Sequence, residues 1–265
     1  MKNAIAVGIA HPYLTIKEIN DFVDSYNQQT IRDIQLLLFV DSNISLNCLN
    51  VLEKIKAPLK IIHDDFVPRG MGFHLQKMNK FLNTNIEYVF RVDLDDILVP
   101  LRFEHQLAYM NNNQEIDIMS GACKVIDSED IYIPPLTNKR ILDYIMFCPI
   151  VHPAVCLRWK SIKVIGGYKN LSRNQDLELW LRCAANGLKF ANTKEVLINY
   201  KRSKKHKTFL DIINIIKLHL YFYRKLNYTK AKLLKIIIMF LVKETIPINL
   251  KNKLRNFFSN NINNK

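Results

Sequence analysis

Three carboxylates follow directly after an apolar run in the segment Tyr88-Val89-Phe90-Arg91-Val92-Asp93-Leu94-Asp95-Asp96. Carboxylates this close together repel one another, and a divalent cation placed among them offsets that repulsion. The apolar run has the composition of a buried strand, and open α/β sheets bind ligands at the carboxyl ends of their strands. The segment therefore predicts a metal site that holds a phosphorylated substrate.

A second acidic pair, Asp176 and Glu178, lies where a helical pattern begins. In a first helical turn the macrodipole favours the ionised carboxylate, which is the form that can accept a proton. The same helix carries an apolar stripe that includes Trp180 and is typical of a buried face. The pair suits a general base, although acids are also common in first turns without any catalytic role.

Short apolar strands alternate with helices over the first hundred residues, which predicts a mostly parallel sheet covered on both faces. Three of these strands end in an acid, at Asp41, Asp64 and Asp93, so one sheet edge is expected to collect polar groups around one ligand. Asp64 fits a solvated loop equally well. The predicted strands cover 4–10, 35–40, 59–62 and 87–92, with helices at 17–26, 49–55 and 70–82; later strand-like segments cover 117–125 and 148–157.

The positive charge is confined to the last quarter of the chain. Residues 1–200 contain 22 Lys and Arg and 22 acids, whereas residues 201–265 contain 16 Lys and Arg against Asp211 and Glu244, which accounts for the whole net charge of +14. Helical patterns at 209–226 and 229–244 join an apolar face to basic residues, as helices at a membrane interface do. This segment predicts an anionic partner. The alternative is a helical pair packed on the preceding domain with a solvated basic side.

Cysteine usage and hydropathy indicate the compartment. The five cysteines are odd in number and scattered, and none forms a C-x-x-C pair, which argues against a disulfide framework and a structural zinc site. The first residues lack a signal-peptide pattern, and no apolar run approaches the roughly 18–20 residues that span a bilayer. We therefore expect a cytoplasmic protein.

Four landmarks, in this order, resemble glycosyltransferase family 2, and in particular the bacterial enzymes that build O-antigen and capsule repeat units. They are Phe39-Val40-Asp41-Ser42, then Arg69-Gly70-Met71-Gly72, then Arg91-Val92-Asp93-Leu94-Asp95-Asp96 with Pro100-x-Arg102, and last His152-Pro153-Ala154 through Gly166-Gly167-Tyr168 to Gln175-Asp176-Leu177-Glu178-Leu179-Trp180-Leu181-Arg182. Each motif is weak alone, and their order and spacing across residues 4–202 carry the resemblance. It implies a GT-A fold.

The resemblance implies a donor-side role for five residues. Asp95 in the DxDD motif binds Mn²⁺ or Mg²⁺ between the phosphates of a nucleotide sugar, and Asp93 shares the metal or contacts the ribose. Asp41 holds the base or ribose, although one acid without glycine stands where the family usually has two acids and Gly; a turn cap is its alternative. Arg69 reaches the diphosphate or is a surface residue. Asp96 orients the loop or touches the substrate, and an N-capping cluster is the alternative for the motif.

On the acceptor side, the resemblance implies that Asp176 is the general base of an inverting transfer. Glu178 then binds or supports the acceptor. His152 is an acceptor contact or a buried, satisfied histidine, and Trp180 lines the acceptor pocket or packs in the core. These roles together describe one displacement at an anomeric carbon.

The sequence thus predicts a metal-dependent, inverting hexosyltransferase. Residues 1–202 form the GT-A catalytic domain, with a nucleotide-sugar half at about 1–110 and an acceptor half at about 111–202, and residues 203–265 form a basic amphipathic helical tail. By resemblance, the enzyme moves glucose or galactose from a UDP-sugar, in a β-1,3 linkage, to N-acetylglucosamine or N-acetylgalactosamine on undecaprenyl diphosphate. It would act in O-antigen, capsule or lipopolysaccharide synthesis on the anionic cytoplasmic face of the inner bacterial membrane, with no nucleic-acid partner.

Three alternatives stay open from the sequence. A UDP-N-acetylhexosamine or dTDP-sugar donor would serve an enzyme that acts on the lipooligosaccharide core. A sugar nucleotidyltransferase would need a glycine-rich loop after the first strand, where this chain has His11-Pro12-Tyr13. A nucleic-acid-binding protein could stack bases on the aromatic residues of the tail, but that function leaves the acid cluster unexplained.

Overall fold

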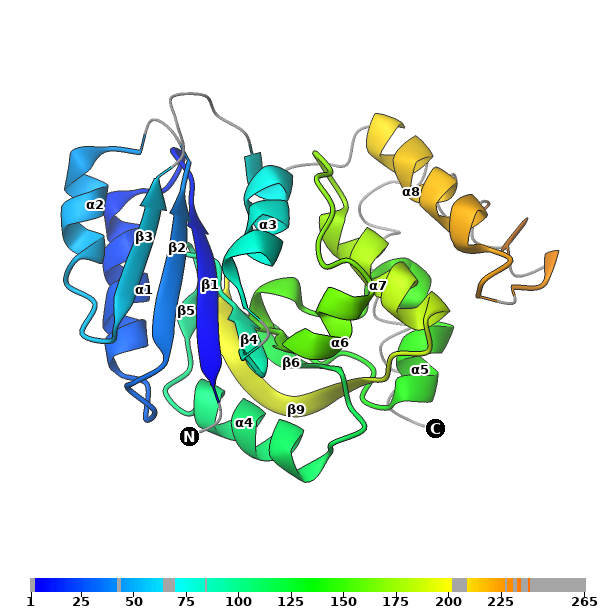
Figure 1. The fold of residues 1–265 in the computed structure, drawn as a ribbon, viewed down its shortest axis with the longest axis horizontal. Helices are drawn as coiled ribbons and strands as arrows, with labels where there is room; N and C mark the ends of the chain where they lie inside the picture. Colours follow the sequence, from blue (N-terminus) through cyan, green and yellow to red (C-terminus); the bar gives the residue numbers. More distant parts are fainter. Residues whose placement is uncertain are drawn as a thin grey trace. The chain divides into compact units, whose positions relative to one another are not determined.

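The computed structural model describes residues 3–41, 44–63, 70–83, 85–201, 209–226, 228–230, 233–234 and 238 (Figure 1). The chain divides into two compact units, Met1–Lys204 and Lys205–Lys265. The predicted strand-end acid Asp64 and the predicted diphosphate ligand Arg69 lie outside the described residues.

One mixed sheet runs through the first unit. Its described strands follow the order β3-β2-β1-β4-β8-β6-β9-β5, with β7 paired to β6. The four strands β3, β2, β1 and β4 are parallel, as predicted from the alternation of strands and helices, whereas β8 is antiparallel to both of its neighbours. The strands are β1 (Ala4–Ala10), β2 (Gln35–Val40), β3 (Leu59–His63), β4 (Tyr88–Arg91), β5 (Ile97–Leu98), β6 (Ile118–Val125), β7 (Ile131–Tyr132), β8 (Cys156–Arg158) and β9 (Phe190–Tyr200).

Helices cover the sheet on both faces, and Figure 1 shows α1 and α2 on one side of β1 to β3 with α3 on the other. The first helix begins at a capping box, in which Thr15 and Glu18 satisfy each other's backbone N–H groups. The helices are α1 (Ile16–Asn27), α2 (Leu46–Leu52), α3 (Gly70–Phe81), α4 (Arg102–Asn112), α5 (Asn138–Asp143), α6 (Trp159–Val164) and α7 (Gln175–Ala185), with 3₁₀ turns η1 (Ile145–Phe147) and η2 (His152–Ala154).

An aromatic cluster beneath β4 fixes the strand that leads into the acid segment. The rings of Phe90 and Phe103 lie 4.7 Å apart, and Tyr26 of α1 meets Phe103 edge-on at 5.5 Å. All three side chains are buried, and burying each stabilises the fold by roughly 1.5–3 kcal/mol. The chain therefore leaves β4 from a rigid support.

Segment 148–157, predicted as extended, is only partly a strand. Cys148 adopts a left-handed conformation, with φ of 54°, and residues His152–Ala154 form the 3₁₀ turn η2 with a proline near its start. Proline fixes φ and removes a backbone donor, so the apolar composition could not continue as a strand through Pro149 and Pro153. Pairing in the sheet begins only at Cys156.

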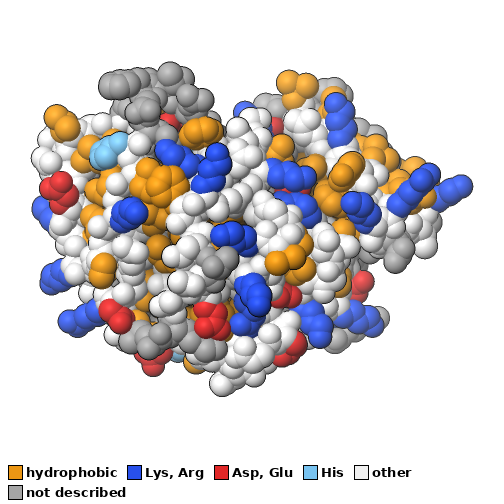
Figure 2. Space-filling view, in the orientation of Figure 1, with side chains coloured by type: hydrophobic (Ala, Val, Ile, Leu, Met, Phe, Trp, Pro, Cys, Tyr) orange, Lys and Arg blue, Asp and Glu red, His pale blue; other side chains and the backbone are white. Residues whose placement is uncertain are grey.

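The described part of the second unit contains the helix α8 (Phe209–Phe222). Ile212, Ile215 and Phe222 are buried, whereas Leu210 and Tyr221 remain 69% and 65% exposed. Figure 2 shows apolar and basic side chains side by side over this helix. The second predicted helix, at 229–244, falls mostly outside the described residues. Among the helices that the structure describes, none combines the length and hydropathy needed to cross a bilayer.

Candidate active site

The acid cluster lies between β4 and β5, at the carboxyl end of a central parallel strand. Asp93 and Asp95 are part exposed, and Asp96 is buried. The backbone N–H of Lys201, at the end of β9, donates to Asp96 Oδ1 over 2.8 Å. The other carboxylate oxygen, Oδ2, is buried and has no hydrogen-bond partner within the described residues. A buried oxygen of this kind is a ready ligand.

The carboxylates in this cluster repel one another. Burial, followed by repulsion from Asp93, raises the pKa of Asp96 well above its ordinary value. The same two causes, in the same order, raise the pKa of Asp95. The buried Arg91 pairs directly with Asp93, while Arg102 attracts Asp96 from a greater distance. Among the described residues, the three acids therefore have one direct ion pair between them, that of Asp93 with Arg91.

This donor set fits a hard divalent cation. Carboxylate oxygens are the preferred ligands of Mn²⁺ and Mg²⁺, and Mg²⁺ is commonly held by one or two carboxylates together with substrate phosphates and water. No group of three or more His, Cys, Asp or Glu side chains in the described chain converges closely enough to hold an ion by itself. The acid cluster therefore fits such a cation only where further ligands come from a bound molecule or water.

Asp41 lies at the same edge of the sheet as the acid cluster, with the strand β1 between them. It follows β2, and its backbone N–H donates to Ala10 O at the end of β1 over 2.9 Å. Asp41 Oδ1 lies 3.4 Å from Nε2 of His74 on α3, and both side chains are buried. Because β1 pairs with both β2 and β4, Asp41 and the acid cluster flank the end of one strand.

Asp176 occupies the first turn of α7, as predicted. The Cys148 thiol donates to Asp176 Oδ2 over 3.3 Å, and the Leu177 backbone N–H donates to Oδ1 over 2.8 Å. Asn174, just before the helix, has a left-handed backbone with φ of 56°. Asp176 is part exposed, so its carboxylate can accept a hydrogen bond from one further donor.

His152 is hydrogen-bonded to Tyr168 and feels the charges of Asp93 and Asp176. Its Nε2 lies 2.8 Å from the hydroxyl of Tyr168. Burial and then the positive charge of Arg91 lower the pKa of His152 to about 4, although Asp176 and Asp93 both oppose that shift. The imidazole is therefore neutral at physiological pH and within electrostatic range of both acids. Asp93 and Asp176, which lie far apart in the sequence, thus both act electrostatically on one imidazole.

Glu178 and Trp180, both on α7, are buried. Glu178 accepts hydrogen bonds from Arg182 over 2.9 and 2.8 Å and pairs with Lys169 at 3.1 Å. Burial acts to raise the pKa of Glu178, but these cations outweigh it and lower the pKa. Trp180 is fully buried, and its ring meets His152 edge-on at 6.0 Å. Both residues thus support the site from within the packed helix.

Two further residues of the motifs, Arg91 and Tyr168, contact the candidate site residues, although the sequence alone indicated no role for them. An arginine inside an apolar strand requires a partner when it is buried, and that rule could have directed attention to Arg91. The hydroxyl of a buried tyrosine carries the same requirement, but its partner is not readable from spacing.

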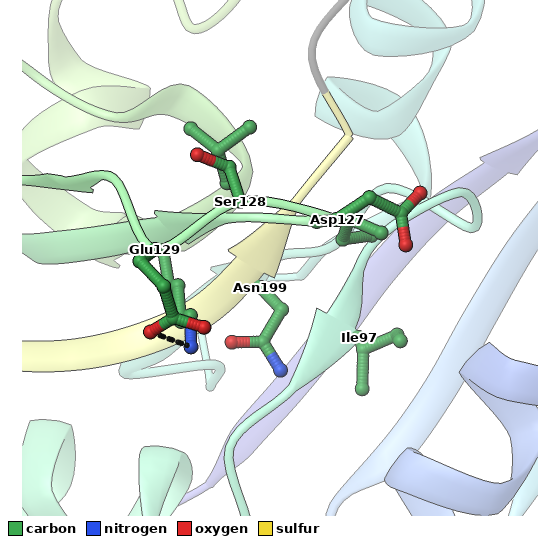
Figure 3. Close-up of a pocket in the computed structure, with 8 residues that line it drawn as sticks. Ile97, Asp127, Ser128, Glu129 and Asn199 are labelled. Carbon is green, nitrogen blue, oxygen red and sulfur yellow. Dashed lines mark hydrogen bonds and ion pairs between the residues drawn. The ribbon is translucent and has the colours of Figure 1, made fainter.

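A cavity of about 420 Å³ lies beside β5 and the turn that follows β6 (Figure 3). Ile97, which follows Asp96 in the chain, lines it beside its strand partner Asn199. Figure 3 shows Asp127 and Glu129 contributed by the turn between β6 and β7. Asp93, Asp95 and Asp96 do not line this cavity, so it is a neighbour of the candidate site.

Similar proteins were found by sequence, although no protein-family model matches the chain. The chain is 27% identical over 223 residues to an uncharacterized glycosyltransferase of Methanocaldococcus jannaschii, covering 82% of this chain and 76% of that protein. It is 29% identical over 196 residues to the amylovoran biosynthesis glycosyltransferase AmsE of Erwinia amylovora, covering 70% and 71%. It is 27% identical over 200 residues to the Escherichia coli UDP-Gal:alpha-D-GlcNAc-diphosphoundecaprenol beta-1,3-galactosyltransferase, covering 70% and 69%.

Solved structures share the fold. Staphylococcus aureus TarS 1-349 in complex with UDP-GlcNAc matches with a TM-score of 0.68 at 16% identity, covering 91% of this chain and 72% of that one. The mannosyltransferase PcManGT of Pyrobaculum calidifontis, in complex with GDP-Man and Mn²⁺, matches with a TM-score of 0.55 at 10% identity, covering 96% and 79%. The predicted GT-A fold and the resemblance to glycosyltransferases are confirmed.

The repulsion in the acid cluster predicts that Asp96→Asn stabilises the metal-free protein. Because the fold raises the pKa of Asp96, the ionised carboxylate destabilises the fold near neutral pH, and protonation relieves this cost as the pH falls through the raised pKa. We expect the variant to gain roughly 1 kcal/mol at pH 7, or about 2–4 °C in Tm, and the gain to shrink at lower pH.

Calorimetry in EDTA measures this difference. The exposed Asp143→Asn serves as the control and should leave Tm unchanged. A lower Tm for Asp96→Asn at pH 7 would show that the carboxylate is well compensated in the fold.

Proposed function

We propose that this chain, a homologue of archaeal and bacterial glycosyltransferases, transfers a hexose from a UDP-sugar to a sugar carried on a lipid diphosphate. The observation that carries the proposal is the acid cluster at the sheet edge together with Asp176 in the first turn of α7, because both act electrostatically on His152. The E. coli relative is named for UDP-Gal and a diphosphoundecaprenol acceptor, which supports both substrate classes. Two further relatives are named for amylovoran and O-antigen biosynthesis, which favours a role in surface polysaccharide synthesis.

The donor half binds and orients the nucleotide sugar. Asp95, with Asp96 or Asp93, would hold Mn²⁺ or Mg²⁺, which when bound offsets charge on the departing nucleoside diphosphate. Because Arg91 already pairs with Asp93, Asp95 is the least compensated of the exposed acids and the main candidate ligand. Asp41, which follows β2 at the same edge of the sheet, accepts a hydrogen bond from the base or ribose.

The acceptor half supplies the base. Asp176 takes the proton of the acceptor hydroxyl while the hydroxyl oxygen forms a bond to the anomeric carbon. The bond from that carbon to the diphosphate oxygen breaks on the opposite face, so one displacement inverts the anomeric configuration. Glu178 takes no proton in this scheme, because Arg182 and Lys169 hold it ionised and buried.

Transfer from a panel of radiolabelled donors tests the proposal. Purified full-length chain is given UDP-glucose, UDP-galactose, UDP-N-acetylglucosamine or a dTDP-sugar, with N-acetylglucosamine or N-acetylgalactosamine diphosphate joined to a lipid. We expect label from a UDP-hexose to enter the lipid product, to be lost in EDTA and to return with Mn²⁺. Transfer that survives EDTA would exclude a metal requirement. Transfer from the dTDP-sugar alone would contradict the proposed UDP-hexose donor.

Replacing the base gives a second prediction. Asp176→Asn keeps the shape of the side chain but cannot accept the proton, so kcat should fall by about 10²–10⁴-fold with little change in KM for the UDP-sugar. Initial-rate kinetics measure both constants, with Asp143→Asn as the matched control. A variant that keeps more than half of the wild-type kcat would exclude Asp176 as the base.

The basic C-terminal segment supports a place at the membrane. The net charge of +14 is carried by residues 201–265, and α8 exposes Leu210 and Tyr221 beside Lys217. Exposed apolar side chains among cations suit an anionic lipid surface, where each cation contributes about 1 kcal/mol. We propose that this segment holds the enzyme at the cytoplasmic leaflet, where a lipid-linked acceptor is found.

Sedimentation with vesicles tests the membrane proposal. We expect the full-length chain to bind phosphatidylglycerol vesicles, to release as salt rises, and to bind phosphatidylcholine poorly. Reversing charge in the second unit at Lys217, Arg224 and Lys225 to Glu should weaken binding. The control reverses three exposed lysines of the first unit, Lys54, Lys56 and Lys60. Equal loss of binding in the two triple variants would reject the segment as the membrane contact.

A further inference from the structure

The turn at residues 165–168 is clamped between two helices of the candidate site. From α7, Arg182 donates to Ile165 O over 2.7 Å and to Gly167 O over 2.6 Å. From α3, Asn79 donates to Tyr168 O over 2.8 Å and accepts from Tyr168 N over 3.1 Å. A Cβ on Gly167 would lie 2.1 Å from Asn79 Oδ1, and its φ is +62°, so only glycine allows this approach. The backbone of Tyr168 is therefore fixed on both sides.

The hydroxyl of Tyr168 has one partner in the described structure, Nε2 of His152 at 2.8 Å. Tyr168 is 1% exposed, so water cannot replace that partner. A buried O–H without an acceptor costs about 1–3 kcal/mol, so the hydroxyl must donate its proton to Nε2. A ring nitrogen that accepts carries no hydrogen, which places the proton of the neutral imidazole on Nδ1.

The remaining nitrogen of His152 is thus a hydrogen-bond donor. His152 is part exposed, and Nδ1 makes no hydrogen bond to the described residues. Asp176, which acts on the same imidazole electrostatically, can only accept while it is ionised. A hydrogen-bond donor and a hydrogen-bond acceptor in one site match a sugar hydroxyl, which can both accept and donate a hydrogen bond.

We propose that Tyr168 and Asn79 are positioning residues that hold His152 in the Nδ1–H tautomer, so that this N–H donates to an oxygen of the acceptor sugar. The inference rests on the proposed function, since it assigns the acceptor side of the same site. Asn79 fixes the backbone of Tyr168, the Tyr168 hydroxyl fixes the proton of His152, and His152 meets the substrate. Neither Tyr168 nor Asn79 touches the sugar.

The tautomer of His152 can be measured without an activity assay. In protein labelled with ¹⁵N at its seven histidines, long-range ¹H–¹⁵N spectra distinguish a protonated Nδ1 from a protonated Nε2, and His152→Gln identifies the signal by its loss. We expect Nδ1–H in the wild type and an increase of the Nε2–H form in Tyr168→Phe, which keeps the ring but lacks the hydroxyl. A wild-type His152 protonated on Nε2 would overturn the inference.

Kinetics test what the tautomer does. With N-acetylglucosamine diphosphate on a lipid as the probe, Tyr168→Phe should raise KM for this acceptor about 5–10-fold, which corresponds to one lost or misdirected hydrogen bond, and leave KM for the UDP-sugar unchanged. Asn79→Ala should likewise raise the KM for the lipid-linked acceptor. In a His152→Gln background, Tyr168→Phe should have no further effect.

Tyr26→Phe is the matched control, because Tyr26 is also buried and its hydroxyl donates to a single acceptor, Ile34 O, over 3.0 Å. It should leave both KM values unchanged. An unchanged acceptor KM in Tyr168→Phe, or an equal effect with and without His152, would reject the positioning role while leaving the proposed function intact. Absence of transfer by the wild type with any donor would instead overturn the proposed function, and the acceptor role with it.

Discussion

Repulsion among Asp93, Asp95 and Asp96 is the constraint around which the first unit is organised. A buried strand, β4, delivers these acids to the sheet edge, and the aromatic cluster beneath it prevents the chain from relaxing away. The interior supplies two guanidinium groups: Arg91 pairs with Asp93, and Arg102 donates to the Arg91 carbonyl over 2.6 Å. This compensation is incomplete, since the pKa values of Asp95 and Asp96 stay raised. The fold thus retains negative charge where a cation and a diphosphate would complete the balance.

The part of the fold around α7 has a different requirement, which is to hold polar groups in fixed orientations inside a packed layer. Arg182 carries much of this task, because its guanidinium satisfies Glu178 and two backbone carbonyls of the turn at 165–168. A buried arginine stabilises a fold only when its donors are paired in this way. Glu178 is therefore better understood as part of the frame around Asp176 than as a second reacting acid.

Much of the fold was predictable because it is set by local signals. A fully apolar run such as β2 must be buried on both faces, and a capping box fixes where α1 begins. The convergence of Asp41 and the acid cluster also follows from the sequence, since parallel strands end at one edge. The hydrogen-bond partners of Tyr168, His152 and Glu178 could not be predicted from the sequence, because tertiary packing decides which side chains meet. At 148–155 two prolines overrode the apolar pattern that predicted a strand.

The helix α3 contacts both Asp41 and the turn at 165–168. His74 faces Asp41, and Asn79, five residues later, holds the backbone of Tyr168. Residues five apart in a helix are separated by about 7.5 Å along its axis and move together as one rigid piece. Under the proposed function, a donor that shifts or steadies α3 would therefore change the free energy of binding of the acceptor. By thermodynamic linkage the acceptor would change donor affinity by the same factor, so the contacts of α3 would provide a physical basis for cooperative binding of the two substrates.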